Sequence, residues 1–196
     1  MPTEAKNPPG LLFDEDTHTY TYNGITVPSV TEIMRPLTKK VYGEINLITL
    51  NRAADRGTRV HRAIQFWGEF KYKNTDEETE PYFDQFMKFS KELNVEILKS
   101  EFRLFHKRLL YVGTADLLVS ENGLGPVLVD IKTTRTIHEG LLSVQLAAYK
   151  EAAKWCGYDI KRTAVLLISK DGYTFRDIEP DFGMFLNCLS IYRFKP

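Results

Sequence analysis

The sequence predicts a mixed α/β fold, an α+β mixed sheet flanked by helices with an N-terminal β-hairpin and helical extension. Three observations predict it. Apolar residues recur at helical spacing over 51–70, the period changes to that of strands over 101–132, and a helical pattern at 141–155 separates two apolar strands. A helix between two buried strands is typical of a crossover that makes them parallel, so the sheet should be mixed.

The length of 196 residues favours one domain. Residues 1–10 are rich in Pro, Gly and polar residues, and we expect them to be flexible. Residues 11–196 should then form a single domain. Its N-terminal part, 11–95, would carry the hairpin and helices, and residues 96–196 would carry the sheet core.

The N-terminal hairpin is predicted from a turn signal between two strand-like segments. The segment Leu11–Tyr22 ends at Asn23-Gly24, a dipeptide that favours a tight hairpin turn. Ile25–Val27 would be the returning strand.

Helix start and stop signals place three helices after the hairpin. Ser29 and Glu32 stand at the spacing of a capping box, and Pro36 should end that short helix. The next helices are expected over 51–70 and 78–93, each with a stripe of apolar side chains at helical spacing.

The second half of the chain alternates strand and helix patterns. Turn signals at Asn122-Gly123, Gly125-Pro126 and Asp171-Gly172 separate these segments. The predicted order is strands at 101–105, 111–119 and 127–132, a helix at 141–155, strands at 163–169 and 173–178, and a last helix at 180–192.

Charge is balanced overall but uneven along the chain. There are 26 basic and 26 acidic residues, yet the segment 35–73 has nine Lys/Arg against three acids, and 76–84 has five acids and no base. A neutral total can therefore hide a positive face, formed here by Arg52, Arg56 and Arg59. A solvated helix face is the alternative explanation.

Four charged residues fall on the predicted apolar strands: Glu101, Asp116, Asp130 and Lys132. Asp130 and Lys132 are two residues apart and project from the same face. Antiparallel pairing would bring Asp116 close to Asp130. Because converging buried carboxylates repel one another, a hard cation such as Mg²⁺ or Mn²⁺ would stabilise them. Strand ends or a surface ion pair are the alternative.

Two helices add candidate groups. His61 lies beside the apolar stripe of the 51–70 helix, and Mn²⁺ accepts an imidazole readily. Gln145 and Tyr149 are four residues apart and share a helix face. A core histidine and a surface polar pair are the corresponding structural explanations.

These motifs resemble a known family in their order. The run of GTRVH (57–61), Glu101, GTAD (113–116), VDIKT (129–133) and QLAAY (145–149) resembles the RecB-like branch of the PD-(D/E)XK nuclease superfamily. The segment at 18–34 is similar to an element of phage-type exonucleases and of the mitochondrial genome maintenance exonuclease. Together the motifs cover about two thirds of the chain.

The resemblance implies a restriction-endonuclease-like core and a metal-dependent active site. The positions that match metal ligands are His61, Asp116, Asp130 and the Ile131 carbonyl, for Mg²⁺ or Mn²⁺. Lys132 would position or activate the attacking water, and Glu101 would bind a second metal ion or a water molecule.

The remaining matched positions are implied to contact the substrate. Gln145 and Tyr149 match an element that lines the active site. Ser29 and Thr31 match a polar helix start that could hold a backbone phosphate, as helix starts can. Apart from the resemblance, the basic side chains of Arg52, Arg56 and Arg59 would follow the phosphate backbone of DNA in a nuclease.

The expected function is therefore that of a metal-dependent DNA exonuclease in phage or bacterial recombination and repair. The alternatives are a structure-specific endonuclease and a non-cleaving DNA-binding or recombination accessory protein. With only Cys156 and Cys188 we expect no iron–sulfur cluster, and without a P-loop motif unwinding needs a partner such as a helicase or recombination protein. With no apolar segment long enough to cross a bilayer and no N-terminal signal, we expect no membrane contact and a cytoplasmic location in a bacterial or phage-infected cell.

Overall fold

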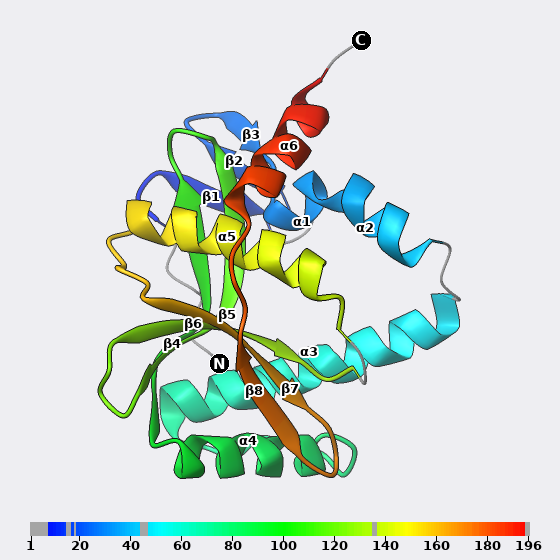
Figure 1. Cartoon of the computed structure of the whole chain (residues 1–196), viewed down its shortest axis with the longest axis vertical. Helices are drawn as coiled ribbons and strands as arrows, with labels where there is room; N and C mark the ends of the chain where they lie inside the picture. The colour runs from blue at the N-terminus through cyan, green and yellow to red at the C-terminus, as the bar shows by residue number, and fades with distance from the viewer. Residues whose placement is uncertain (1–7, 15–16, 18, 44–46, 135–136, 195–196) are drawn as a thin grey trace.

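The computed structural model describes residues 8–14, 17, 19–43, 47–134 and 137–194, with the backbone alone for 47–54. The predicted flexible segment 1–10 therefore lies mostly outside the described residues. In chain order the elements are β1 (Leu11–Asp14), β2 (Thr19–Tyr22), β3 (Ile25–Val27), α1 (Val30–Ile33), α2 (Arg35–Tyr42), α3 (Leu47–Phe70), α4 (Glu80–Glu92), β4 (Val95–His106), β5 (Tyr111–Glu121), β6 (Pro126–Lys132), α5 (Glu139–Trp155), β7 (Arg162–Ile168), β8 (Tyr173–Asp177) and α6 (Phe182–Arg193) (Figure 1).

The main sheet has five strands in the order β4-β5-β6-β7-β8. The β6–β7 pair is parallel, and the other neighbouring pairs are antiparallel. Helix α5 connects the parallel pair, as a crossover between parallel strands requires. The predicted mixed sheet flanked by helices is confirmed.

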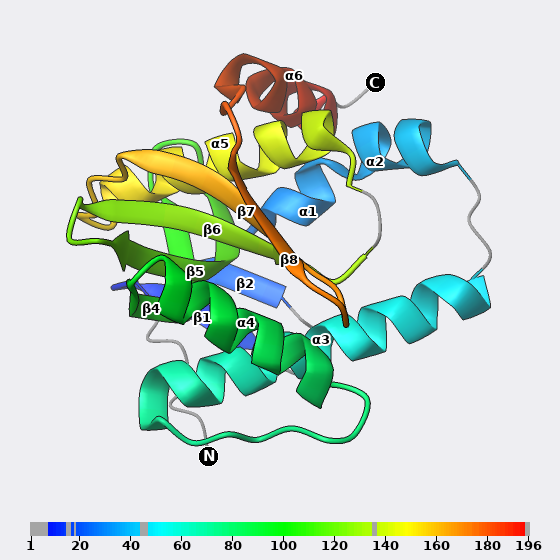
Figure 2. The same ribbon diagram turned by 60° about the horizontal axis from the view of Figure 1, so that its bottom comes forward.

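Helices cover both faces of this sheet, so the core has two layers. Figure 2 shows α5 and α6 on one side of the strands and α3 and α4 on the other. Side chains of α1, α5 and α6 pack with Leu118 and Leu128 of the sheet. On the opposite face α3 and α4 contribute a cluster with Leu117 and Val129. This cluster includes four buried aromatic residues of α4, which are Tyr82, Phe83, Phe86 and Phe89. Successive side chains of β5 and β6 point to opposite faces of the sheet, so each strand contributes to both core layers.

A smaller antiparallel sheet of β1, β2 and β3 precedes the first helix. The predicted Asn23-Gly24 turn joins β2 to β3, with φ of 51° and 78° at the two residues, a conformation that suits Asn and Gly. Leu11 and Val27 pack on Phe105 of β4 and Val112 of β5. This contact fixes the N-terminal sheet against one end of the β4–β5 ribbon.

Several predicted boundaries are wrong. The expected single strand at 11–22 is two strands, so the hairpin is a three-stranded sheet. Pro36 does more than end a helix: α1 ends at Ile33, and Pro36 lies in the first turn of α2, where its missing N–H has no helical partner to lose. Helix α3 begins four residues before the predicted position, and β4 begins six residues before it.

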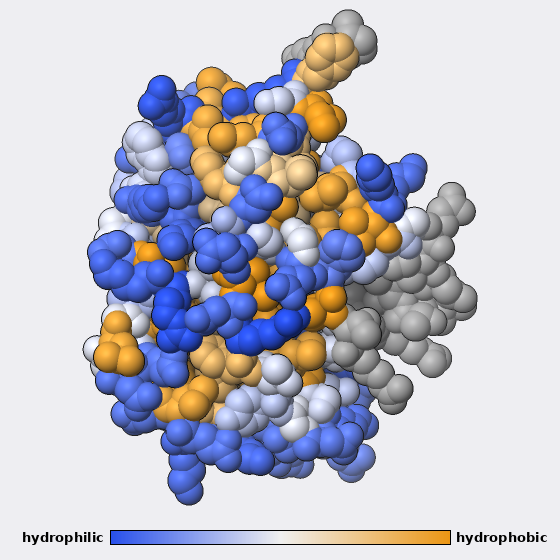
Figure 3. Space-filling view, in the orientation of Figure 1, coloured by the Kyte–Doolittle hydropathy of each residue, from blue (hydrophilic) through white to orange (hydrophobic). Residues whose placement is uncertain are grey.

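No helix among the described residues is long and apolar enough to cross a membrane. Exposed apolar side chains gather on and after α6, including Met184, Ile191 and Phe194. Figure 3 shows hydrophobic residues at the top of the molecule, where Figure 1 places α6.

Candidate metal centre

The candidate site lies where β5 and β6 separate. Their ladder ends at the pair Leu117–Val129, one step before Asp116 and Asp130 would meet. Strand β6 instead continues beside β7 as far as Lys132. In place of a ladder bond, the Ile131 N–H donates to Asp116 Oδ2 at 2.6 Å. The fork therefore turns the Asp116 carboxylate toward β6.

Strand β4 carries Glu101 into the same fork by an irregular backbone. Glu101 lies between the pairs Ser100–Leu117 and Phe102–Ala115, which places it opposite Asp116. Its φ is 43°, in the left-handed region that non-glycine residues rarely occupy. Residues with a strained backbone conformation of this kind cluster at active sites and ligand-binding sites. The Glu101 carboxylate reaches His61, with Oε1 3.2 Å from Nδ1.

His61 completes this cluster from α3, the helix that packs on one face of the main sheet. Its Nε2 lies 3.1 Å from the Ile131 carbonyl oxygen, and its Nδ1 lies 3.6 Å from Asp116 Oδ1 as well as near Glu101. Both ring nitrogens thus face oxygen acceptors, and the imidazolium form satisfies both. Burial lowers the pKa of His61, but the Asp116 and Glu101 carboxylates outweigh it and raise that pKa to about 9.

The donor set fits a hard divalent cation. His61, Glu101 and Asp116 each offer a ligand atom, and these atoms all lie within 4.8 Å of one another. In octahedral coordination with bonds of about 2.1 Å, neighbouring ligands are about 3.0 Å apart and opposite ligands about 4.2 Å apart. The 3.2 Å contact between His61 Nδ1 and Glu101 Oε1 matches the first value. One imidazole with several oxygens suits Mn²⁺ or Mg²⁺.

Asp130 and Lys132 form a pair beside this cluster. Asp130 is 2% exposed, and its Oδ2 lies 2.7 Å from Lys132 Nζ. That oxygen has no hydrogen bond of good geometry among the described residues, so it can accept a further ligand or donor. The predicted projection of both side chains from one face is confirmed. In the structure Glu101, rather than Asp130, groups most closely with His61 and Asp116.

The charges in this site shift one another's proton affinity. Burial raises the pKa of Asp130 to about 6, against the lowering effect of Lys132. Burial also raises the pKa of Asp116, against the effect of His61. Burial lowers the pKa of Lys132, but the carboxylates of Asp130 and Asp116 raise it by more. The net pKa is therefore raised, and Lys132 remains an ammonium ion at neutral pH.

The expected pair on α5 lies next to the acidic cluster. Gln145 Nε2 donates to the Tyr149 hydroxyl at 3.0 Å, and Tyr149 is buried. Burial raises the pKa of Tyr149, and the charges of Asp116, Asp130 and Glu101 add to the increase because they lie nearby. The structure therefore brings this pair to the site that the motif order predicted.

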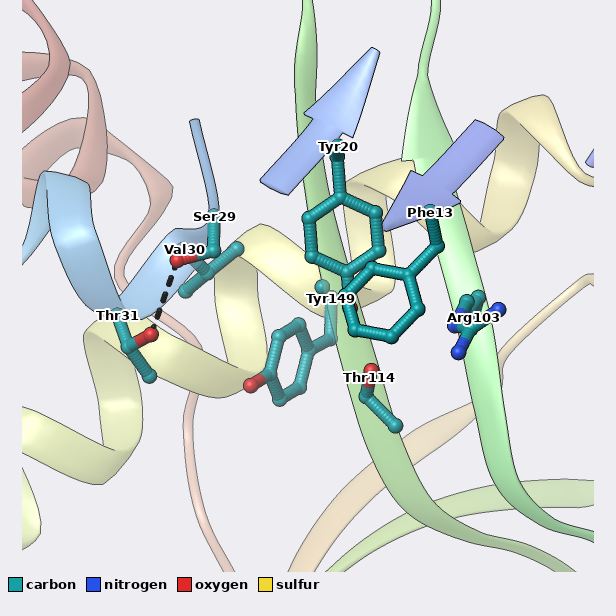
Figure 4. A pocket seen from close by; sticks show the side chains of 9 residues that line it. Phe13, Tyr20, Ser29, Val30, Thr31, Arg103, Thr114 and Tyr149 are labelled. Atoms are coloured by element: carbon teal, nitrogen blue, oxygen red, sulfur yellow. Dashed lines mark hydrogen bonds between the residues drawn. The ribbon is translucent and has the colours of Figure 1, made fainter. Parts of the chain in front are cut away.

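Ser29 and Thr31 stand across a pocket from Tyr149, at the start of α1 (Figure 4). The capping box is confirmed, since the Glu32 N–H donates to Ser29 Oγ and the Ser29 N–H donates to the Glu32 carboxylate. The Ser29 and Thr31 hydroxyl oxygens are 3.0 Å apart. Their predicted contact with a phosphate stays a prediction.

Gly113 is a functional position whose role the sequence analysis missed. A Cβ atom at Gly113 would lie 2.3 Å from Cε1 of Tyr149, far inside any allowed contact. Glycine therefore lets the Tyr149 ring lie flat on β5. The residue was noted as the first of GTAD, but nothing local signals that a ring from α5 lies against it.

The predicted arginine stripe divides into different environments. The Arg52 side chain lies outside the described residues. Arg56 is partly buried; its Nη2 donates to the Thr133 carbonyl at 3.3 Å, and its guanidinium lies 5.3 Å from the centre of the Tyr82 ring. Arg59 forms ion pairs with three acids, Asp55, Asp76 and Glu78.

The acidic run after α3 thus folds back on the basic segment. Besides the Arg59 contacts, Lys73 pairs with Glu80 and Asp84. The positive excess of the segment 35–73 is locally reduced by these pairs. A uniform positive face along α3 is not what the described residues form.

Comparisons with known proteins add little to this geometry. No family model matches the sequence, and no curated protein matches it. Eighteen chains of solved structures match, among them a crystal structure named SSO0001. That match has 14% sequence identity and a TM-score of 0.36, and it covers 82% of this chain and 83% of the other. A similarity at this level carries no functional argument, so the proposal below rests on the site itself.

Proposed function

We propose that this chain is a Mg²⁺- or Mn²⁺-dependent deoxyribonuclease of the PD-(D/E)XK type that hydrolyses phosphodiester bonds at DNA ends. The observation that carries the proposal is the convergence of His61, Glu101 and Asp116 at the β5–β6 fork, with the Asp130–Lys132 pair beside them. Four separate segments of the chain supply these groups. If the charged residues were only a surface ion pair, the fold would not need to bring four segments together.

The protein's own residues would hold the cation and order the reactants. His61 through Nδ1, Glu101 and Asp116 are the groups that would bind it. The Ile131 carbonyl, which the motif order implies as a further ligand, faces the other ring nitrogen of His61, Nε2. When bound, Mg²⁺ or Mn²⁺ supplies positive charge at the scissile phosphate and makes water a stronger acid. The Ile131 N–H fixes the orientation of the Asp116 carboxylate.

Lys132 would act as a cation rather than as a base. Because its pKa is raised, the ammonium group donates hydrogen bonds to the attacking water or to a phosphate oxygen. Asp130 holds Lys132 in place at 2.7 Å. Gln145 and Tyr149 would border the reacting phosphate from α5.

The test is a cleavage assay on end-labelled linear single- and double-stranded DNA beside a covalently closed circle. The reactions contain Mg²⁺, Mn²⁺ or EDTA. Wild type is expected to degrade only the linear strands, and only with metal. Asp116→Asn should reduce the rate by more than about 100-fold, since loss of a ligand exceeds the effect of losing an outer partner.

A matched control is Asp159→Asn, because Asp159 has a side chain that is 82% exposed and, among the residues that the structure describes, forms an ion pair with Lys161 on the surface. This variant should cleave like wild type. Cutting of the closed circle would favour the endonuclease alternative. DNA binding without cleavage in either metal would overturn the proposal and favour the accessory-protein alternative.

A further inference from the structure

A pocket of about 420 Å³ opens between the N-terminal sheet and the β4–β5 ribbon. Its walls come from six elements and the residue that caps α1, and they include Phe13, Tyr20, Arg103, Thr31 and Tyr149 (Figure 4). The volume lies in the range of roughly 300–1,000 Å³ that is typical of sites for small organic groups. It suits one nucleotide rather than a duplex.

The pocket carries a stacking surface. The rings of Phe13 and Tyr20 lie 4.6 Å apart between centres, and the Arg103 guanidinium lies 4.3 Å from the centre of the Phe13 ring. In Figure 4 these two rings and that of Tyr149 surround one space, with the hydroxyls of Ser29 and Thr31 at its edge. Flat aromatic and guanidinium groups are the surfaces on which nucleobases stack.

The charge of the lining suits a nucleotide as well. The described residues around the pocket include one cation, Arg103, and no carboxylate. A neutral base could therefore enter with its phosphate near Arg103 and without repulsion. The acids of the metal centre lie beyond Tyr149, whose pKa their charges raise.

The pocket and the metal centre lie along the same two strands. Glu101 and Asp116 face each other on β4 and β5, and the pair Arg103–Thr114 follows two residues further along. Two residues of a strand span about 7 Å. That separation corresponds to roughly one or two nucleotides of a DNA chain. A single DNA strand can therefore occupy the metal centre and the pocket at the same time.

We propose that this pocket holds one unpaired base of a single-stranded DNA end, next to the nucleotide whose bond is cut. The inference rests on the proposed nuclease function and specifies its substrate. A paired base inside a duplex has both faces covered by its neighbours and cannot reach Phe13 and Tyr20, so it would first have to leave the stack.

The experiment combines an abasic scan of the DNA with a change at Phe13. Single-stranded oligonucleotides carry one abasic site at successive positions from the end. Binding is measured in Ca²⁺, and cleavage is measured in Mg²⁺ or Mn²⁺. We expect one position near the end where loss of the base weakens binding roughly 5- to 100-fold, the range of one stacked base.

Phe13→Ala should weaken binding of the intact oligonucleotide by the same factor and should cause no further loss with that one abasic oligonucleotide. Phe13→Trp, which keeps a flat aromatic ring at this position, should bind the intact oligonucleotide like wild type. Leu12→Ala is the matched control, because Leu12 is the neighbouring residue on β1, is 67% exposed and does not line the pocket.

The outcomes separate the two proposals. Cleavage by wild type without a sensitive abasic position, or equal losses for Phe13→Ala with every abasic oligonucleotide, would overturn the pocket assignment and leave the nuclease function intact. A sensitive position in Ca²⁺ that coincides with the Phe13 effect, without cleavage in any metal, would support the pocket and refute the nuclease function.

Discussion

His61 shows how one residue can report on the whole site. Its ring nitrogens face Glu101 and the Ile131 carbonyl, so the protonated ring donates to both oxygens, and Nδ1 must lose its proton before it can bind a cation. A proton and a divalent metal ion therefore compete for the same donors. This competition has a definite sign in the stability of the protein.

The free energy of unfolding in EDTA should fall as the pH rises. His61 has a folded-state pKa of about 9, above its usual 6.5, so its contribution is fully present below pH 6.5 and is lost as the pH passes 9. Asp130, with a pKa raised from 3.8 to about 6, acts in the same direction at lower pH. The His61 contribution is on the order of 3 kcal/mol at most.

Urea unfolding at several pH values between 6 and 9.5 measures this effect. His61→Gln should show a much smaller fall in that window. His106→Gln should keep the fall, because burial lowers the pKa of His106, and a histidine with a lowered pKa does not make stability fall as the pH rises. A wild-type stability that rises from pH 6.5 to 9 would contradict the assigned imidazolium.

At the scale of elements, the fork between β5 and β6 creates the site. Pairing of Leu117 with Val129 keeps the strands together up to the fork, and beyond it β5 stays with β4 while β6 stays with β7. The backbone groups that pairing releases near Asp116 and Ile131 then bind side chains of the site. A regular ladder would leave no space for a cation.

Helix α5 approaches β5 closely at a single glycine. Gly113→Ala would bring a methyl group to 2.3 Å from the Tyr149 ring, so the ring must move. We expect a loss of stability of about 1–3 kcal/mol, as for other overpacked cores. We also expect reduced cleavage, because Tyr149 borders both the metal centre and the pocket.

Two other glycines provide controls for this variant. A Cβ at Gly172 would meet nothing within 4 Å, and at Gly57 the nearest atom is Thr133 Oγ1 at 3.5 Å. Gly172→Ala should therefore unfold near the wild-type denaturant midpoint. Gly57→Ala should unfold at or above it, because Gly57 lies inside α3 and alanine favours a helix interior over glycine. A Gly113→Ala variant with wild-type stability and cleavage would show that Tyr149 does not need this close approach.

At the scale of the whole molecule, the candidate metal centre joins α3 to three strands of the sheet. A cation bound there should stabilise the folded state, because the unfolded chain scatters these ligands. At a metal concentration 100 times the dissociation constant, the stabilisation is about 2.7 kcal/mol. For a chain of this size that corresponds to a rise in Tm of about 5–10 °C.

Thermal unfolding with Mn²⁺, Mg²⁺ or EDTA at pH 8 tests this expectation. Asp116→Asn should lose most of the shift, and the surface variant Asp159→Asn should retain it. An equal shift in wild type and Asp116→Asn would place the bound ion elsewhere on the protein.

Most elements and the chemical groups of the candidate site could be predicted from local sequence patterns. Helical and strand periods, the Ser29–Glu32 capping box and the Asn23-Gly24 turn depend on neighbouring residues, so they could be predicted locally. The boundaries of α3 and β4 were predicted less well, because packing extends elements beyond their local pattern.

Which of these groups lie in contact could not be predicted locally, because it depends on how the elements pack together. The tertiary structure placed Glu101 beside His61 through a left-handed residue, and it set Arg59 against acids that follow it in the chain. It also brought Phe13 of the N-terminal sheet over Arg103 of β4. The physical reason is that such contacts join residues far apart in sequence, whose distance depends on how sheets twist, fork and pack against helices rather than on any local preference.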